Sequence, residues 1–410
     1  MSRRPHVRAR LDALVGGDLG GARQSLVALC LNSTTSFAAG AVLGGITSTF
    51  ERYPGLLVLV PPAIGLRGNI FSTLGTRLST AIHTGTFRFS ARRDTVLGQN
   101  VSAAVVLTMS LSVILAALAK LIAVAFGVDH TIGVGDLAVV SVVGGMLASV
   151  LVLLATVGMT GGAVRYGWDL DDVSAPIVST LGDVLTLPAL WLATGLLGIN
   201  FLTPSLAVVL SGVSLAALVV GWRSELGELS RIVRESVPIL TAACVVSALA
   251  GITVEKRLGS FSRYPALLVL LPAFLSSAGA LGGILSSRLS SKLHLGLVEP
   301  QGMPSREARR DIRVVALLAV PIFVFNGVGA HLVGVALHQA SPGIGRMLLV
   351  AAVGGAAAVA FVLAVAYYGT VAAFRLGVDP DTYGIPVVTS VVDFAGAFAL
   401  VLAIVALGVG

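Results

Sequence analysis

Residues 52–62 read RYPGLLVLVPP and residues 263–273 read RYPALLVLLPA, so the chain contains one stretch twice, with eight of eleven positions identical. Two further pairs of segments match at the same offset of 210–211 residues: 77–85 with 288–296, and 167–171 with 377–381. Apolar segments often match by chance, but these pairs also share positions for Arg, Pro, His and Asp. The sequence therefore predicts an internal duplication.

The composition indicates a membrane protein. Of 410 residues, 56% are hydrophobic and only 11% are charged, whereas a soluble domain carries about 25% charged residues. The net charge of +7 comes from basic residues between apolar runs, a pattern that orients membrane helices rather than one that binds nucleic acid. The two cysteines, Cys30 and Cys244, lie in apolar segments without metal-ligand spacing and are interpreted as small core residues.

Eleven apolar runs are long enough to cross a bilayer, which takes about 20 largely apolar residues. We predict spans at residues 25–49, 54–76, 97–126, 135–163, 173–197, 202–221, 237–255, 265–287, 312–337, 347–373 and 382–409. The predicted fold class is an all-α polytopic membrane protein. The runs 54–76 and 265–287 contain Pro and Gly, so we expect them to be bent or locally unwound and to border a transport path, because membranes tolerate irregular backbone only inside protein or along a cavity.

Each copy of the repeat contains five spans, and a sixth span joins the two copies. Five is an odd number, so a direct fusion would invert the second copy, and the extra span at 202–221 restores its orientation. We therefore predict two parallel repeats about an axis along the membrane normal. The predicted domains are a cytoplasmic N-terminal segment, a first repeat, a linker helix with an amphipathic cytoplasmic connection, and a second repeat: 1–24, 25–197, 198–236 and 237–410.

Basic residues set the predicted orientation. Arg clusters precede the first span and follow the second, sixth and eighth, which places all of them on one side if there are eleven spans. Short loops rich in Lys and Arg face the cytoplasm. We expect a multi-pass cell-membrane protein with a cytoplasmic N-terminus and an external C-terminus.

Two aspartates stand out because they lie deep inside spans. Asp183 comes eleven residues after Asp172, roughly 16 Å along a helix and about half of the hydrocarbon core. Asp393 occupies the same place in the second copy. A carboxylate at this depth costs about 3 kcal/mol, and two that converge repel each other, so a cation between them would relieve both costs. The alternative is a structural carboxylate bonded to a neighbouring helix.

Hydroxyl side chains accompany both aspartates, namely Ser179 and Thr180 in the first copy and Thr389 and Ser390 in the second. They lie three and four residues before each carboxylate, on the same helix face. This oxygen environment without His or Cys argues against Zn²⁺ and Cu⁺ and suits Mg²⁺, which keeps much of its water and needs only one or two carboxylates. The alternative is that the hydroxyls bond to their own helix.

Further polar residues have open interpretations. Five aspartates before these spans form either an acidic vestibule or helix caps: Asp169, Asp171, Asp172, Asp379 and Asp381. Asn69 can contact the water shell of an ion, although the second copy has Ala280 there. Arg67, matched by Ala278, either tunes the field along the path or simply snorkels.

These features resemble the MgtE magnesium transporter family and, within it, the branch called solute carrier family 41. The resemblance rests on residues 61–69 (PPAIGLRGN), 77–80 (RLST) and 169–186 (DLDDVSAPIVSTLGDVLT). It implies that Asp183 and Asp393 bind Mg²⁺ on the shared axis with groups of residues 179–180 and 389–390 nearby, and that the usual dimer is fused into one chain that functions as a monomer. The second copy departs from this pattern, because Gly68-Asn69 becomes Gly279-Ala280.

Three functions from different classes compete. The first is transport of Mg²⁺ or another divalent cation, with the ion as cargo and no cofactor. The second is a Na⁺- or H⁺-coupled exchanger that uses the same carboxylates. The third, an intramembrane enzyme, is disfavoured because the sequence has neither a paired GxGD motif nor HExxH, so we expect no enzymatic activity. The expected partners are divalent cations and the lipid bilayer, not nucleic acid.

Overall fold

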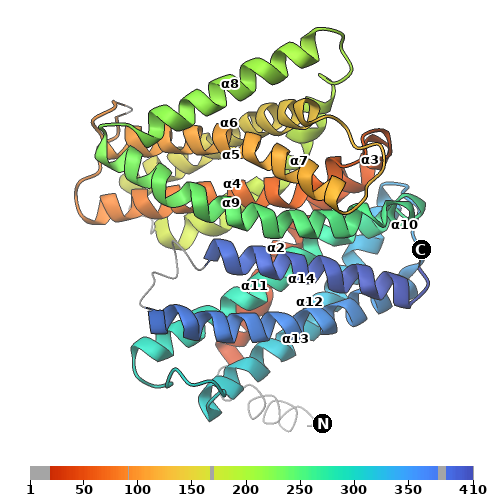
Figure 1. Ribbon diagram of the computed structural model, residues 1–410. Coiled ribbons are helices and arrows are strands. Elements are labelled where there is room, and N and C mark those ends of the chain that lie inside the picture. The colour runs from red at the N-terminus through yellow and green to blue at the C-terminus, as the bar shows by residue number, and fades with distance from the viewer. Residues whose placement is uncertain (1–18, 91, 167–169, 377–384, 410) are drawn as a thin grey trace, which may run out of the picture. The chain divides into compact units, whose positions relative to one another are not determined.

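The protein is all-helical in the computed structural model, which describes residues 19–90, 92–166, 170–376 and 385–409. Within these ranges there are thirteen helices and no strand (Figure 1). The helices are α2 (Leu19–Gly45), α3 (Thr47–Arg52), α4 (Leu56–His83), α5 (Val96–Ala125), α6 (Val134–Tyr166), α7 (Leu170–Thr194), α8 (Leu202–Trp222), α9 (Gly227–Glu255), α10 (Leu258–Arg263), α11 (Ala266–His294), α12 (Arg306–Ala336), α13 (Ile344–Leu376) and α14 (Ile385–Ala406).

Ten helices in the described part of the chain are long and apolar enough to cross a membrane, and α7 contributes a shorter apolar stretch, Thr180–Thr194. Each of the eleven predicted spans therefore corresponds to a helix. Large apolar side chains on their surfaces are exposed, such as Val208 of α8 at 73% and Leu121 of α5 at 65%. A bilayer covers such surfaces, and the prediction of a polytopic membrane protein is confirmed.

The helices form two compact units. Unit 1 contains α2 and α11–α14, and unit 2 contains α3–α9; α10 begins at the boundary between them. In unit 1, α2 packs against α11 and α12, while in unit 2, α9 packs against α4 and α5 (Figure 1). Each unit thus takes its first long helix from the other half of the sequence.

The same close contact holds the exchanged helix in both units. A Cβ atom placed on Gly251 of α9 would lie 2.7 Å from the backbone of Val58 in α4. Gly40 of α2 approaches the backbone of Val269 in α11 in the same way. Both residues of the second pair correspond to the first at an offset of 211. The repeat seen in the sequence is therefore also a repeat of packing, with the first helices exchanged.

The predicted local unwinding of the Pro-rich spans is wrong. Helix α4 runs without a break through Pro61 and Pro62, and α11 runs through Pro272. The irregular backbone comes earlier, between α3 and α4, where Gly55 has φ +89°. The Glu255 carboxylate at the end of α9 accepts a hydrogen bond from the Gly55 N–H at 2.8 Å and so satisfies a donor at the start of α4.

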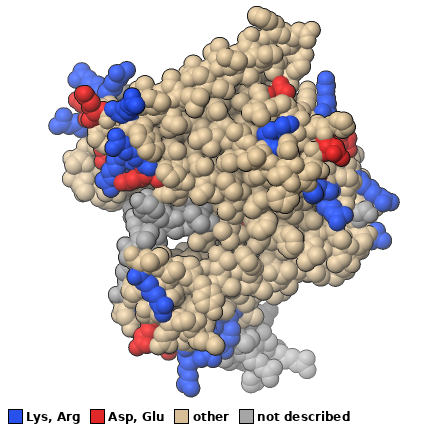
Figure 2. All heavy atoms as spheres, in the orientation of Figure 1, with Lys and Arg blue, Asp and Glu red and all other residues tan. Residues whose placement is uncertain are grey.

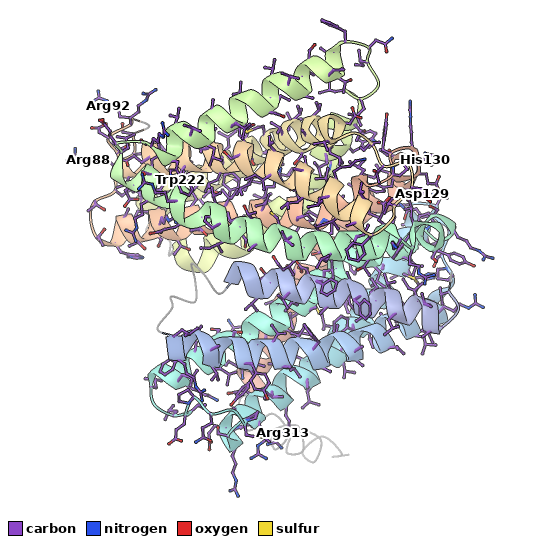
Figure 3. The ribbon with its side chains drawn as sticks, in the orientation of Figure 1. Arg88, Arg92, Asp129, His130, Trp222 and Arg313 are labelled. Carbon is purple, nitrogen blue, oxygen red and sulfur yellow. The ribbon has the colours of Figure 1, made fainter. Side chains whose placement is uncertain are left out.

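Charged side chains concentrate toward the helix ends, and the surface between them is almost entirely uncharged (Figure 2). In unit 2, Arg88, Arg92 and Trp222 lie at one end of the helices, and Asp129 and His130 lie at the opposite end (Figure 3). This arrangement agrees with spans that cross a bilayer between two polar interfaces.

Candidate functional site

Asp183 lies on α7 and is half-buried. Its neighbour Gly182 is buried against α4, where an added Cβ atom would lie 3.5 Å from the Gly68 nitrogen and 3.6 Å from the Arg67 Cβ. Because these two glycines let α7 and α4 approach closely, Asp183 sits at the level of Gly68 and Asn69, halfway along α4. The structure thus brings together two of the residues singled out in the sequence.

One face of α4 is open at this level. A Cβ atom added to Gly65 or to Gly68 would meet no described atom within 4 Å. Asn69 is half-buried, and its backbone carbonyl accepts the Thr73 hydroxyl at 2.7 Å. These glycines are therefore not needed for close packing along this face, and they leave room beside a carboxylate for an ion that keeps its water.

A row of hydroxyls continues along α4 from this level to the end of the helix, and the sequence reasoning missed it. Each hydroxyl donates to the carbonyl four residues earlier: Ser72 at 2.6 Å, Thr76 at 3.2 Å, Thr80 at 3.0 Å and Thr84 at 2.9 Å. Their oxygens keep lone pairs for water or a cation. The spacing of four within an apolar span is the signal that would have revealed them.

Unit 1 repeats the arrangement. Asp393 is half-buried on α14, and the preceding residue, Val392, approaches Gly282 of α11, whose added Cβ atom would lie 3.9 Å from the Val392 Cγ2. Gly279 and Gly283 of α11 face open space. The aspartate-bearing helix therefore packs on the Gly-rich helix in both units.

The accompanying hydroxyls are only partly described. Thr180 and Thr389 are half-buried, and Ser390 is 4% exposed, while the side chain of Ser179 is outside the described set. Among the predicted vestibule aspartates, Asp171 and Asp172 belong to the first turn of α7 without described side chains; the others fall outside the described residues: Asp169, Asp379 and Asp381.

No group of three or more His, Cys, Asp or Glu side chains that could hold a metal ion occurs in the part of the chain with described side chains. A dehydrated ion of the Zn²⁺ type needs such a cluster. One carboxylate per unit beside open, hydroxyl-lined helix faces suits an ion that retains its water shell.

Arg67 points into unit 2 rather than out of it. Its side chain is 1% exposed, and its Nη1 donates to the Ala63 carbonyl at 2.5 Å. The guanidinium fills the space above Gly145, where an added Cβ atom would collide with Nη2 and lie 2.8 Å from the Ser112 Oγ. The Nε and Nη2 atoms have no hydrogen-bond partner, so Arg67 is a buried positive charge close to the level of Asp183.

The fold and the site define a class of protein: a multi-span membrane protein made of two related helical units, each with an intramembrane aspartate against a Gly-rich helix. A family described as "MgtE: Divalent cation transporter" matches residues 60–193 and 271–403, which include both aspartates. The chain belongs to this family.

Named relatives agree with this assignment. Solute carrier family 41 member 2 of Homo sapiens is 26% identical over 416 residues, which cover 93% of this chain and 69% of the relative. Solute carrier family 41 member 3 of Rattus norvegicus is 25% identical over 400 residues, 92% of this chain and 86% of the relative. No solved structure matches the chain. Family membership supports divalent cation transport across a membrane and favours a transporter over an enzyme.

Proposed function

We propose that this protein transports Mg²⁺, and that Asp183 and Asp393 together bind one largely hydrated ion. The single observation that carries the proposal is the seat of Gly182 on Gly68, which sets Asp183 beside the open face of α4. Its counterpart in unit 1 sets Asp393 beside α11. The ion is the cargo, and the transport reaction needs no further cofactor.

The energetic argument concerns the two buried charges. An intramembrane carboxylate costs about 3 kcal/mol unless a partner compensates it, and a divalent cation compensates two at once. Mg²⁺ dehydrates reluctantly and is usually held by one or two carboxylates and retained waters. The open faces beside Gly65 and Gly68, and beside Gly279 and Gly283, leave room for that water.

The fused arrangement leads us to propose that one chain is the functional unit. Its N-terminus then faces the cytoplasm and its C-terminus the outside. Loops 86–96 and 297–311 are cytoplasmic in this orientation, and residues 127–134 are external. The separation of Arg88 and Arg92 from Asp129 and His130 supports opposite sides for the unit 2 loops (Figure 3). Single-cysteine labelling of intact cells tests this, and labelling of residue 90 from outside would overturn it.

A flux assay tests the function. Purified protein in liposomes should admit Mg²⁺, reported by an internal dye, and Asp183→Asn should abolish entry. The competing function is a Na⁺- or H⁺-coupled exchanger at the same carboxylates. Mg²⁺ entry that needs neither gradient supports a channel, and entry that strictly follows one gradient supports exchange. Normal flux in Asp183→Asn, with correct folding shown by gel filtration, would exclude the proposed site.

A further inference from the structure

A basic pocket lies within unit 1, where the last turns of α11 meet the first turns of α12. It has a volume of about 500 Å³. The residues that line it include two serines, three cations and a carboxylate: Ser287, Ser291, Arg288, Lys292, Arg310 and Asp311. None of these residues takes part in the proposed ion path.

The charges in this pocket do not balance. Asp311, with its side chain 5% exposed, lies 2.5 Å from the Lys292 Nζ and 3.9 Å from the Arg288 Nη1. Arg310 is exposed at the rim. Three cations against one carboxylate leave a formal excess of two positive charges. In the low dielectric near a membrane, such an excess attracts an anion.

The corresponding corner of unit 2 is neutralised from within. At the offset of 211, Lys292 becomes Ala81, Arg310 becomes Gln99 and Asp311 becomes Asn100, so Arg77 is the cation that remains. Helix α9 then supplies acidic residues, because Glu228 and Glu235 both act electrostatically on Arg77. The first turn of α9 also covers the corner, where the Leu229 N–H donates to the Gln99 Oε1 at 3.3 Å.

Helix α2 takes the place of α9 in unit 1 and supplies no such acid in its described part. Its first turn has no acidic residue. Gln24 stands where α9 has Glu235, and Arg23 stands where α9 has Arg234. The positions that match Glu228 and Leu229 precede the described residues. The two units therefore share a corner that differs in charge, and the described residues of unit 1 leave its excess unbalanced.

We propose that this pocket binds the phosphate of an anionic phospholipid headgroup. The planar guanidinium of Arg, the ammonium of Lys and nearby hydroxyls are the donors that bind phosphate oxygens, and basic pockets between spans recognise charged headgroups. The neighbouring loop favours a lipid over a free anion. It exposes Leu295 by 73%, Leu297 by 62% and Met303 by 81%, and such side chains insert into the bilayer interface.

Arg310 provides the sharpest test because Arg309 is a matched control. Both are exposed on the same helix, and only Arg310 lines the pocket. Native mass spectrometry or a titration in neutral detergent would measure binding of phosphatidic acid to wild type, Arg310→Gln and Arg309→Gln. We expect about tenfold weaker binding for Arg310→Gln alone, since one charge-assisted contact is lost. Gel filtration and the unfolding midpoint check that both variants are folded.

A second variant separates geometry from net charge. Lys292→Ala/Asp311→Asn copies the residues of unit 2 and removes one charge of each sign, so it should weaken lipid binding although the net charge is unchanged. Equal effects of Arg310→Gln and Arg309→Gln would show diffuse surface attraction and overturn the proposal. So would absence of phosphatidic acid binding. If inorganic phosphate binds wild type as tightly and Arg310→Gln abolishes this, the pocket takes a free anion and the lipid assignment is wrong.

Discussion

Arg67 in unit 2 and Phe323 in unit 1 fill corresponding spaces. The Arg67 guanidinium lies over Gly145 next to Ser112, while the Phe323 ring lies over Gly355 and packs on Phe274 with ring centroids 4.8 Å apart. At the repeat offsets, Ser112 corresponds to Phe323 and Arg67 to Ala278. One copy thus fills the space from α4 with a charge, and the other fills it from α12 with an aromatic ring.

Transplanting the packing of unit 1 into unit 2 should work only as a pair of changes. Ser112→Phe alone should destabilise the protein by about 1–3 kcal/mol, because the ring overpacks a space that Arg67 already fills. Arg67→Ala/Ser112→Phe should recover at least the wild-type unfolding midpoint in detergent, since a well-packed apolar group often replaces a buried charge without loss. Additive effects of the two changes would contradict this account. Mg²⁺ flux of the double variant then isolates the role of the charge in transport.

The two aspartates should behave as one site. Asp183→Asn and Asp393→Asn each keep the side-chain shape and remove half of the negative charge, so each should weaken Mg²⁺ binding by more than about tenfold. Calorimetry on both single variants and the double variant measures this. The double variant should be little worse than either single variant, because one ion couples both carboxylates. Normal binding in either single variant would exclude a shared site.

The exchange of first helices can be checked by cross-linking. Ser33 of α2 and Ser277 of α11 lie with their hydroxyl oxygens 2.9 Å apart. With Cys30 and Cys244 replaced by Ser, the variant Ser33→Cys/Ser277→Cys should form a disulfide under mild oxidation, identified by mass spectrometry of the linked peptides. If each half of the sequence instead folded on its own helices, position 33 would face Leu66, the counterpart of Ser277, and Ser33→Cys/Leu66→Cys would be the pair that cross-links.

Glycines in the same helices should differ in their tolerance of alanine. Gly251→Ala places a methyl group 2.7 Å from the Val58 backbone, and we expect a loss of about 1–3 kcal/mol, because backbone atoms cannot move aside as a side chain can. Gly65→Ala, whose methyl group meets no described atom within 4 Å, should leave the unfolding midpoint unchanged or raise it slightly through better helix propensity. Similar midpoints for the two variants would argue against the close α9–α4 contact.

The sequence predicted the helices better than their partners. Each predicted span became a helix because about 20 apolar residues in a bilayer have one stable conformation. The predicted unwinding failed because Pro61, Pro62 and Pro272 fall within the first two turns of α4 and α11, where the missing N–H groups cost little. Helix exchange could not be predicted, since Gly40 and Gly251 look alike in sequence and either half offers the same Val. The surroundings of Arg67 depended on the unrelated positions 112 and 145, which no motif connects.

The exchanged helix also constrains how the protein is made. Helix α2 ends at Gly45, and its packing partner α11 begins 221 residues later, at Ala266. At about 5–20 residues per second, translation leaves α2 in the bilayer for roughly 10 to 45 seconds before α11 is complete. During that time Asn32 and Ser33, which later bond to Ser276 and Ser277, face lipid or an insertion factor. Neither half of the chain can finish its own bundle, so separately expressed halves should be degraded when alone and should complement each other when produced together.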